Sequence, residues 1–534
     1  MDTRPLFPIA ILLGLTVAGC GGGGRSGADA TVLEVSQDIV ALDSSALLGV
    51  HEDRVDDLPS ELPPLPDIPP ETSPPADVAQ DLGEDVPSTP GLDMDLLMAA
   101  LGAGDGDGID AQMVLYDGPV CDEETCLVVT WLPEHDVVAI RGEFNAWEEE
   151  AMEASPLAGW FWAVVPAAVV DGCKQYKLFA DDQWFPDPLN RWIGFADIAI
   201  NSALCPAGVS RIALVEGVYS PQLDNTRSLY VYVPAPAFDD PGATFPVLYM
   251  QDGFNVFTNP MTPFGAWEID GAADALIATG EVAPLIIVGV DTDDRMDEYL
   301  YAGITVDLGG GPIQVTPLLP DYAEFLVDVV KPLVDERFPT KPGRGDTAIA
   351  GSSLGGISSL WIAWHHADVF GRVASFSGSY WVGQEGSGTE GHPTMESVLQ
   401  QASPSADQLA LKIYMDSGTL SSMGQPGQEY TGDGRSYTDW TRNVLIDLGW
   451  DNRPEWDDDG DLETAPADFP ISSDPAGVPT LYWSPTVPAG YADWGDYLGP
   501  DRNLLHLVGE GHAHNEAAWA ARSGAMLRFL FPGS

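Results

Sequence analysis

The fold is decided by the segment Thr347-Ala-Ile-Ala-Gly-Ser-Ser-Leu-Gly-Gly-Ile-Ser-Ser-Leu-Trp-Ile-Ala-Trp364. Its first four residues form an apolar run that favours a strand buried on both faces of a sheet. A helical stretch follows from Ile357 to His366. Between them, Gly351-Ser-Ser-Leu-Gly355 fits a sharp strand-to-helix turn, whose glycines leave room for a serine hydroxyl raised above the sheet edge. We therefore predict Ser353 as a nucleophile, and exclude Ser352 because its offsets from the glycines are wrong.

Residues 209–534 repeat this alternation of strands and helices. A clear helical stretch is Tyr322–Val334, and the apolar runs that read as buried strands are Phe245–Met250, Leu285–Val290, Leu411–Met415 and Leu504–Val508. Such alternation predicts an α/β fold with a doubly wound, mainly parallel sheet.

A serine attacks at neutral pH only when a base takes its proton. With this turn, an acid and then a histidine follow the serine along the chain. His512 and His514 lie in the loop after the last apolar run, whereas His506 lies inside that run and is predicted to be structural. For the acid we prefer Asp433, just before a predicted helix, and keep Asp416, at the end of a strand, as the alternative.

Acyl transfer also needs two N–H groups aimed at the developing oxyanion. One is predicted at the backbone of Leu354, directly after the serine. The other is predicted in the loop after the run Phe245–Met250, at Gly253 or Phe254. A glycine there would let a substrate carbonyl approach the backbone closely.

Several motifs of this region resemble the putative esterase family, which includes enterochelin esterases, esterase D-type S-formylglutathione hydrolases, and feruloyl and acetylxylan esterases. They are Phe245–Gly253, Trp267–Asp270, Asp294–Tyr299, Gly351–Gly356, Phe370–Gly371 and Ser377–Trp381. The resemblance implies an α/β-hydrolase fold and catalysis without a metal or cofactor. It also favours His514 over His512 as the base, because in the family a short helix carrying a tryptophan follows this histidine, as in His514–Trp519.

Residues 119–208 contain short β-rich runs and are predicted to form a separate small domain. The motifs Arg141–Trp147, Tyr176–Asp181 and Trp184–Pro188 resemble the glycogen-binding type of carbohydrate-binding module. That resemblance implies an immunoglobulin-like β-sandwich. Trp147 and Trp184 could stack on a sugar ring, or the domain could serve only to shape the cleft of its neighbour.

The N-terminal part of the chain reads as an export signal and a tether. A short apolar run ends at Val17-Ala-Gly-Cys20, which resembles a bacterial lipoprotein signal over residues 1–19, with Cys20 lipidated. Residues 20–118 are predicted to be a disordered acidic linker, because Asp, Glu and Pro are frequent there and it cannot bury enough apolar surface. Within it, Gly91–Leu101 could form one short helix. We expect the lipid to hold the protein on a bacterial membrane, either at the outer membrane and cell surface or facing the periplasm.

The charge of the chain limits its partners. Lys and Arg number 22 against 82 Asp and Glu, a net charge of −60. Such a protein repels phosphate backbones, so nucleic acid is excluded as a partner. The same net charge weighs mildly against anionic substrates. Acyl chains would hold the protein on a membrane regardless of this charge.

Four further cysteines suit the oxidising compartment that an exported chain enters. We expect the local pairings Cys121 with Cys126 and Cys173 with Cys205, as two disulfides. A zinc site is the weaker alternative, because the spacings are irregular.

Two charged features have open roles. Glu455–Glu463 places oxygens at alternate positions like the front of a calcium loop, but the closing glutamate is replaced by Pro466. Arg295 and Glu298 are expected to form an ion pair near the cleft.

Together these features predict a serine esterase that cleaves a carboxylic ester through an acyl-enzyme on Ser353. The substrate would be an enterochelin-like ester or a feruloyl or acetyl ester of a carbohydrate. The alternative is a non-catalytic, carbohydrate-binding surface lipoprotein with a relic hydrolase domain.

Overall fold

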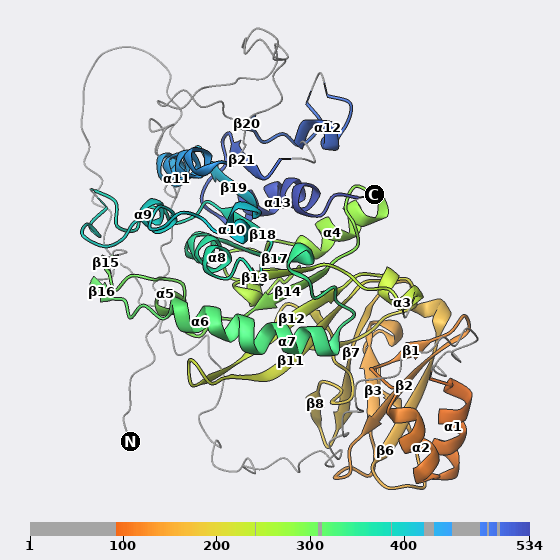
Figure 1. Ribbon diagram of the computed structural model, residues 1–534. Coiled ribbons are helices and arrows are strands. Elements are labelled where there is room, and N and C mark those ends of the chain that lie inside the picture. The colour runs from red at the N-terminus through yellow and green to blue at the C-terminus, as the bar shows by residue number, and fades with distance from the viewer. Residues whose placement is uncertain are drawn as a thin grey trace, which may run out of the picture. The chain divides into compact units, whose positions relative to one another are not determined.

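The computed structural model describes residues 92–240, 242–307, 312–385, 387–420, 432–450, 481–488, 491–498 and 502–533 (Figure 1). The chain divides into Met1–Thr89 and Pro90–Ser534, and all described residues lie in the second unit. The predicted signal, Cys20 and the acidic segment 455–463 lie outside the described residues. Within the described part, no helix is both long and apolar enough to cross a membrane.

The central sheet of residues 209–534 is mostly parallel. Its strand order is β20-β21-β19-β18-β17-β13-β14-β12-β11. Within this order, the β11–β12 and β12–β14 pairs are antiparallel and the other pairs are parallel. Their bounds are β11 (Arg211–Ser220), β12 (Asn225–Val233), β13 (Val247–Gln251), β14 (Ile286–Val290), β17 (Thr347–Ser352), β18 (Arg372–Phe376), β19 (Lys412–Gly418), β20 (Leu481–Tyr482) and β21 (Leu504–Gly509). A separate hairpin joins β15 (Thr305–Asp307) and β16 (Pro312–Gln314). The predicted buried strands are therefore present.

Helices cover both faces of this sheet, because its strands are apolar on both sides. In β13, Val247 and Tyr249 enter one buried cluster, while Leu248 and Met250 enter the other. The helices are α3 (Pro236–Asp239), α4 (Ile269–Ala278), α5 (Arg295–Glu298), α6 (Leu319–Phe325), α7 (Lys331–Arg337), α8 (Leu354–His365), α9 (Met395–Leu399), α10 (Ala406–Leu409), α11 (Arg435–Leu448), α12 (Trp494–Leu498) and α13 (Glu516–Leu530). Helix α8 lines the first cluster, and α4 and α13 line the second, which is a doubly wound α/β arrangement.

Residues 119–208 form two sheets around a third cluster that includes Val128, Ile140 and Leu178. One sheet is β1 (Val120–Cys121), β2 (Thr125–Trp131), β6 (Trp160–Pro166) and β5 (Glu153–Ala154). The other is β9 (Trp192–Phe195), β10 (Ile200–Leu204), β7 (Lys174–Ala180), β8 (Gln183–Phe185), β3 (Ala139–Gly142) and β4 (Glu150–Ala151). The structure contains both expected disulfides, Cys121–Cys126 and Cys173–Cys205.

The two regions share one continuous sheet. Ile212 and Ala213 of β11 pair with Ile193 and Trp192 of β9, so the second sheet of the sandwich runs into the central sheet of residues 209–534. The apolar residues Trp192 and Cys205 also enter the first buried cluster of that sheet. The predicted boundary at residue 208 therefore lies in a connection between two strands of the same sheet.

The prediction of a disordered linker to residue 118 is wrong at its C-terminal end. Residues in that stretch form helices α1 (Met94–Ala103) and α2 (Gly106–Met113), capped by the side chains of Asp93 and Asp105. Strand β2 is buried on both faces, and the helices supply Leu97, Leu101 and Ile109 to its outer face. Aspartates and glycines that suggested a tether are here caps and turns between short helices.

Candidate active site

Ser353 sits at a strained turn between β17 and α8. Its backbone has φ 56° and ψ −119°, a conformation that a serine adopts only when its surroundings enforce it. A Cβ at Gly351 would lie 2.6 Å from the carbonyl oxygen of Gly355, so the turn closes only with glycine. The N–H of Ser353 donates to the carbonyl oxygen of Phe376 at 2.9 Å, which ties the turn to β18.

The Ser353 hydroxyl lies beside a second serine. Ser353 Oγ is 3.4 Å from Ser379 Oγ, and the N–H of Ser379 donates to the carbonyl oxygen of Ser353 at 2.9 Å. Among the hydrogen bonds of the described residues, none joins Ser353 to His514. Hydrogen bonds of this kind are often long before substrate binds.

Asp433 and His514 are brought together. His514 Nδ1 lies 2.6 Å from Asp433 Oδ1, and the Asp433 side chain is fully buried while that of His514 is 28% exposed. Asp433 lies in the turn Gly432–Gly434, and its Oδ2 accepts the N–H of Gly418 at the end of β19. His514 follows β21. Serine, acid and histidine thus lie beyond the carboxyl ends of β17, β19 and β21.

Asp416, the alternative acid, has a different partner. It is fully buried and accepts two hydrogen bonds from Arg522, at 2.8 Å from Nε and 3.0 Å from Nη2. Burial raises the pKa of the Asp416 carboxyl above its ordinary value, and the positive charge of Arg522 opposes that rise.

The other two histidines also have partners elsewhere. His512 Nδ1 lies 3.1 Å from Arg522 Nη1, and burial together with the charge of Arg522 lowers its pKa. His506 is fully buried beside Arg442, and burial lowers its pKa well below the ordinary value. His514 is thus the histidine that contacts Asp433.

The predicted oxyanion donors occupy two neighbouring turns. Leu354 is the first residue of α8, so its N–H has no carbonyl one turn earlier to pair with. The N–H of Phe254 donates to Asp291 Oδ1 at 2.8 Å, which leaves Gly253 as the better donor of the two candidates. A Cβ at Gly253 would lie 2.7 Å from backbone carbons of Gly289 and Val290, so only glycine fits against β14.

Residues 220–438 match the family model described as putative esterase. The chain is similar to that family over this region.

Two curated relatives illustrate the range of the family. An endo-1,4-beta-xylanase/feruloyl esterase of Xylanibacter ruminicola is 28% identical over 145 residues, 26% of this chain and 18% of its own length. An iron(III) salmochelin esterase of Escherichia coli is 28% identical over 214 residues, 36% of this chain and 49% of its own length. The chain therefore spans less than two thirds of either relative. A solved ferulic acid esterase covers 60% of this chain and 98% of its own, with 16% identity and a TM-score of 0.38.

Near the turn that holds Ser353, Arg295 forms an ion pair with a different residue from the one expected. It donates to Asp252 Oδ1 at 2.7 Å and to the carbonyl oxygen of Ser352 at 3.3 Å, whereas Glu298 pairs with Arg227 at 2.8 Å. The expected Arg295–Glu298 pair is therefore wrong. Arg295 instead joins the turn that holds Gly253 to the residue before Ser353.

Sequence reasoning missed three polar residues near Ser353, Asp433 and His514. Ser377, at φ 45°, donates to Asp433 Oδ2 at 2.5 Å. Ser379 contacts Ser353, as described above. Glu516 is half-buried two residues after His514 and accepts a hydrogen bond from Asn255 at 3.2 Å. The two serines belong to the motif Ser377–Trp381, which was noticed only as a resemblance.

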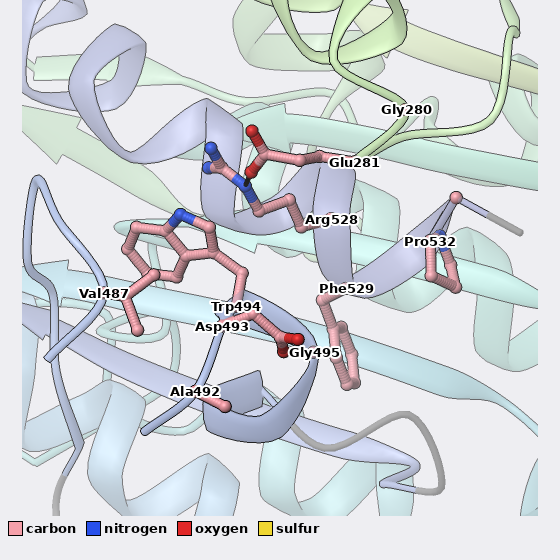
Figure 2. A pocket seen from close by; sticks show the side chains of 11 residues that line it. Gly280, Glu281, Val487, Ala492, Asp493, Trp494, Gly495, Arg528, Phe529 and Pro532 are labelled. Carbon is pink, nitrogen blue, oxygen red and sulfur yellow. Dashed lines mark hydrogen bonds and ion pairs between the residues drawn. The ribbon is translucent and has the colours of Figure 1, made fainter. Parts of the chain in front are cut away.

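One cavity of the described part lies away from this site. It measures about 530 Å³ and lies against the C-terminal end of α13, where Arg528 pairs with Glu281 beside Trp494 (Figure 2). His514 lies just before the start of α13. A helix of 15 residues spans roughly 20 Å at about 1.5 Å per residue. This cavity therefore lies at the opposite end of α13 from His514.

Proposed function

We propose that the protein is a serine esterase in which Ser353 is the nucleophile, His514 the base and Asp433 the acid. The observation that carries this proposal is the 2.6 Å contact between Asp433 and His514 at the sheet edge where Ser353 adopts its strained turn. A buried carboxylate on Nδ1 leaves Nε2 of the imidazole as the proton acceptor.

In the first half of the reaction, Ser353 Oγ attacks the ester carbonyl as His514 Nε2 takes its proton. The carbonyl oxygen becomes an oxyanion, which the N–H groups of Leu354 and Gly253 stabilise. The C–O bond to the alcohol then breaks, His514 gives its proton to the leaving oxygen, and Ser353 carries the acyl group.

In the second half, water replaces the alcohol. His514 takes a proton from the water, whose oxygen attacks the acyl carbon, and a second oxyanion forms. Its collapse breaks the bond to Ser353 Oγ, which recovers its proton from His514, and the carboxylic acid leaves.

The surroundings of the nucleophile favour neutral esters. A Cβ at Gly355 would lie 3.5 Å from Asp252 Oδ2, so this carboxylate lies against the turn. Burial, with a contribution from the charge of Asp252, raises the pKa of Glu516 above its ordinary value. Arg295 is the cation in this group, and it is already paired with Asp252. An uncharged carbohydrate ester suits this site better than an anionic siderophore ester.

Covalent labelling tests the proposal. We expect a fluorophosphonate to add once to the folded protein, and mass spectrometry of peptides to place the adduct on Ser353. The variant S353A should lose the adduct and ester hydrolysis, while S352A should keep both. A folded wild-type protein without adduct would contradict an enzymatic role and favour the non-catalytic alternative.

We further propose that Cys20 carries a lipid that holds the enzyme on a bacterial membrane surface. The sequence Val17-Ala-Gly-Cys20 supports this. Expression of the full chain with a radiolabelled fatty acid should label the wild type and not C20A, and C20A should move from the membrane to the soluble fraction. Labelling of C20A would contradict the assignment.

A second function, sugar binding by the sandwich, has one specific observation in its favour. The Trp184 side chain is 46% exposed, and its ring lies 6.3 Å from that of Trp147. The Arg141 guanidinium lies over the Trp184 ring at 4.9 Å, so a sugar ring would stack on the part of the indole that this contact leaves exposed. Retention on immobilised polysaccharide should fall in W184A, and equal retention of both proteins would contradict it.

A further inference from the structure

The buried side of the Asp433–His514 pair contains a hydroxyl group whose proton can be located. Ser377, 1% exposed, follows β18, and its Oγ has three hydrogen-bonding neighbours. Trp519 Nε1 donates to it at 3.0 Å and Arg522 Nη2 donates to it at 3.1 Å. The third neighbour is Asp433 Oδ2 at 2.5 Å.

These contacts leave one destination for the Ser377 proton. A serine hydroxyl has one proton and two lone pairs. The indole N–H of Trp519 and the guanidinium of Arg522 can only donate, so they occupy both lone pairs. The Ser377 proton must therefore point at Asp433 Oδ2.

The consequence passes through Asp433 to His514. Oδ2 accepts from Ser377 Oγ and from the N–H of Gly418, so the carboxylate is held by two donors on one oxygen. Oδ1 is left for His514 Nδ1. An ionised carboxylate has no proton to give, so Nδ1 must be the protonated nitrogen and Nε2 the basic one.

Arg522 is itself held in place. Its Nε and Nη2 donate to Asp416, and Asp416 Oδ1 also accepts the N–H of Ser377 at 3.1 Å. Arg522 and Asp416 are both fully buried. This ion pair therefore fixes the guanidinium that directs the Ser377 hydroxyl.

We propose that Ser377 is a positioning residue of the esterase: its proton, committed to Asp433 by Trp519 and Arg522, fixes the carboxylate and the proton-accepting form of His514. This role rests on the triad under Proposed function. Ser377 does not touch substrate, so its loss should lower kcat and leave KM nearly unchanged.

The test compares S377A with S375A in the full chain. Ser375 is an equally buried serine on β18, but its hydroxyl accepts from Tyr380 and does not contact Asp433. For S377A we expect kcat on 4-nitrophenyl acetate to fall by about 10- to 100-fold. Losing a residue that orients a metal-binding side chain has an effect of this size, and Ser377 orients Asp433 in the same way. KM should change less than twofold. S375A should retain kcat within about threefold, because it removes a buried hydroxyl of the same size but no hydrogen bond to Asp433.

A spectroscopic signal separates positioning from general damage. The Nδ1 proton of His514 should give a far-downfield proton resonance that is lost in D433N. We expect S377A to shift or broaden this resonance and S375A to leave it unchanged. Should S377A not fold, S377G removes the same hydroxyl, and glycine adopts φ 45° without strain.

The outcomes distinguish the two proposals. Full activity in D433N would overturn the triad itself. An inactive D433N together with an S377A or S377G that matches S375A in kcat and in the His514 resonance would overturn only the role of Ser377.

Discussion

The sandwich and the carboxyl edge of the hydrolase sheet both bury a carboxylate, but they use it differently. In the sandwich, Asp187 accepts hydrogen bonds from Tyr176 at 2.7 Å and from the N–H of Leu189 at 3.1 Å, and the Tyr176 side chain is itself fully buried. At the sheet edge, Asp433 is buried but contacts His514, which is partly exposed. Burial alone therefore does not separate the two carboxylates. The contact of Asp433 with a side chain that reaches solvent does.

Replacement of Asp433 by asparagine (D433N) is the change with the largest expected effect on activity. An asparagine can hold the imidazole in the wrong tautomer, so kcat should fall by about 10³- to 10⁴-fold while the protein stays folded. Steady-state kinetics and circular dichroism measure both quantities. D433N activity within tenfold of wild type would show that its contact with His514 is merely structural.

The matching change at the other acid, D416N, should act on stability. Removing its charge breaks the buried ion pair with Arg522, whose other carboxylate contact, Asp433 Oδ2, lies farther away at 4.0 Å. Breaking a buried ion pair typically costs about 3–5 kcal/mol. Urea unfolding should show a much lower midpoint for D416N than for D433N. The comparison fails if D416N is as stable as wild type and inactive.

The buried carboxylate of the sandwich should respond to pH in a defined direction. Burial raises the pKa of Asp187 from 3.8 to about 6. The folded state therefore binds more protons than the unfolded state between these values, so the contribution of this group to stability falls as pH rises through that window. The loss is about 2–3 kcal/mol from the size of the shift. Unfolding free energies at pH 4 and pH 7 should differ less in D187N, and an unchanged difference would contradict this.

Glu516 offers the finest test, because it is half-buried in the first turn of α13, two residues after His514. In E516Q we expect kcat/KM for an anionic ester to rise about three- to tenfold relative to a neutral ester of the same acyl group, since one repulsive charge is removed. E510Q, which changes an exposed glutamate in the preceding loop, serves as the control. Equal selectivity in both variants would show that Glu516 does not face the substrate.

Much of the fold and part of the site could be predicted from local patterns. The run Thr347–Ala350 and the glycines at 351 and 355 require a strand, a tight turn and a helix, whatever the rest of the chain does. His514 could be ranked above His512 only through a family resemblance. The choice between Asp433 and Asp416 could not be made firmly, because it depends on which of them contacts His514 and which forms the shorter ion pair with Arg522.

The network around Ser377 lies beyond such reasoning. Its hydroxyl direction depends on Trp519 and Arg522, which are more than 140 positions away in the sequence. At the ordered end of the acidic linker, one short helix could be suggested from the sequence but α2 and the packing could not. Asp93 and Asp105 stabilise helix ends as readily as they favour disorder, and the apolar outer face of β2 decides between the two.

The pairing of β9 with β11 has a practical consequence for handling this protein. A fragment that begins at residue 209 would lose the neighbour of Ile212 and Ala213 and would expose an unprotected strand edge. Such edges recruit other chains and lead to aggregation. Production of the catalytic region for crystallisation should therefore start before helix α1, near residue 90, and not at the boundary suggested by the sequence motifs.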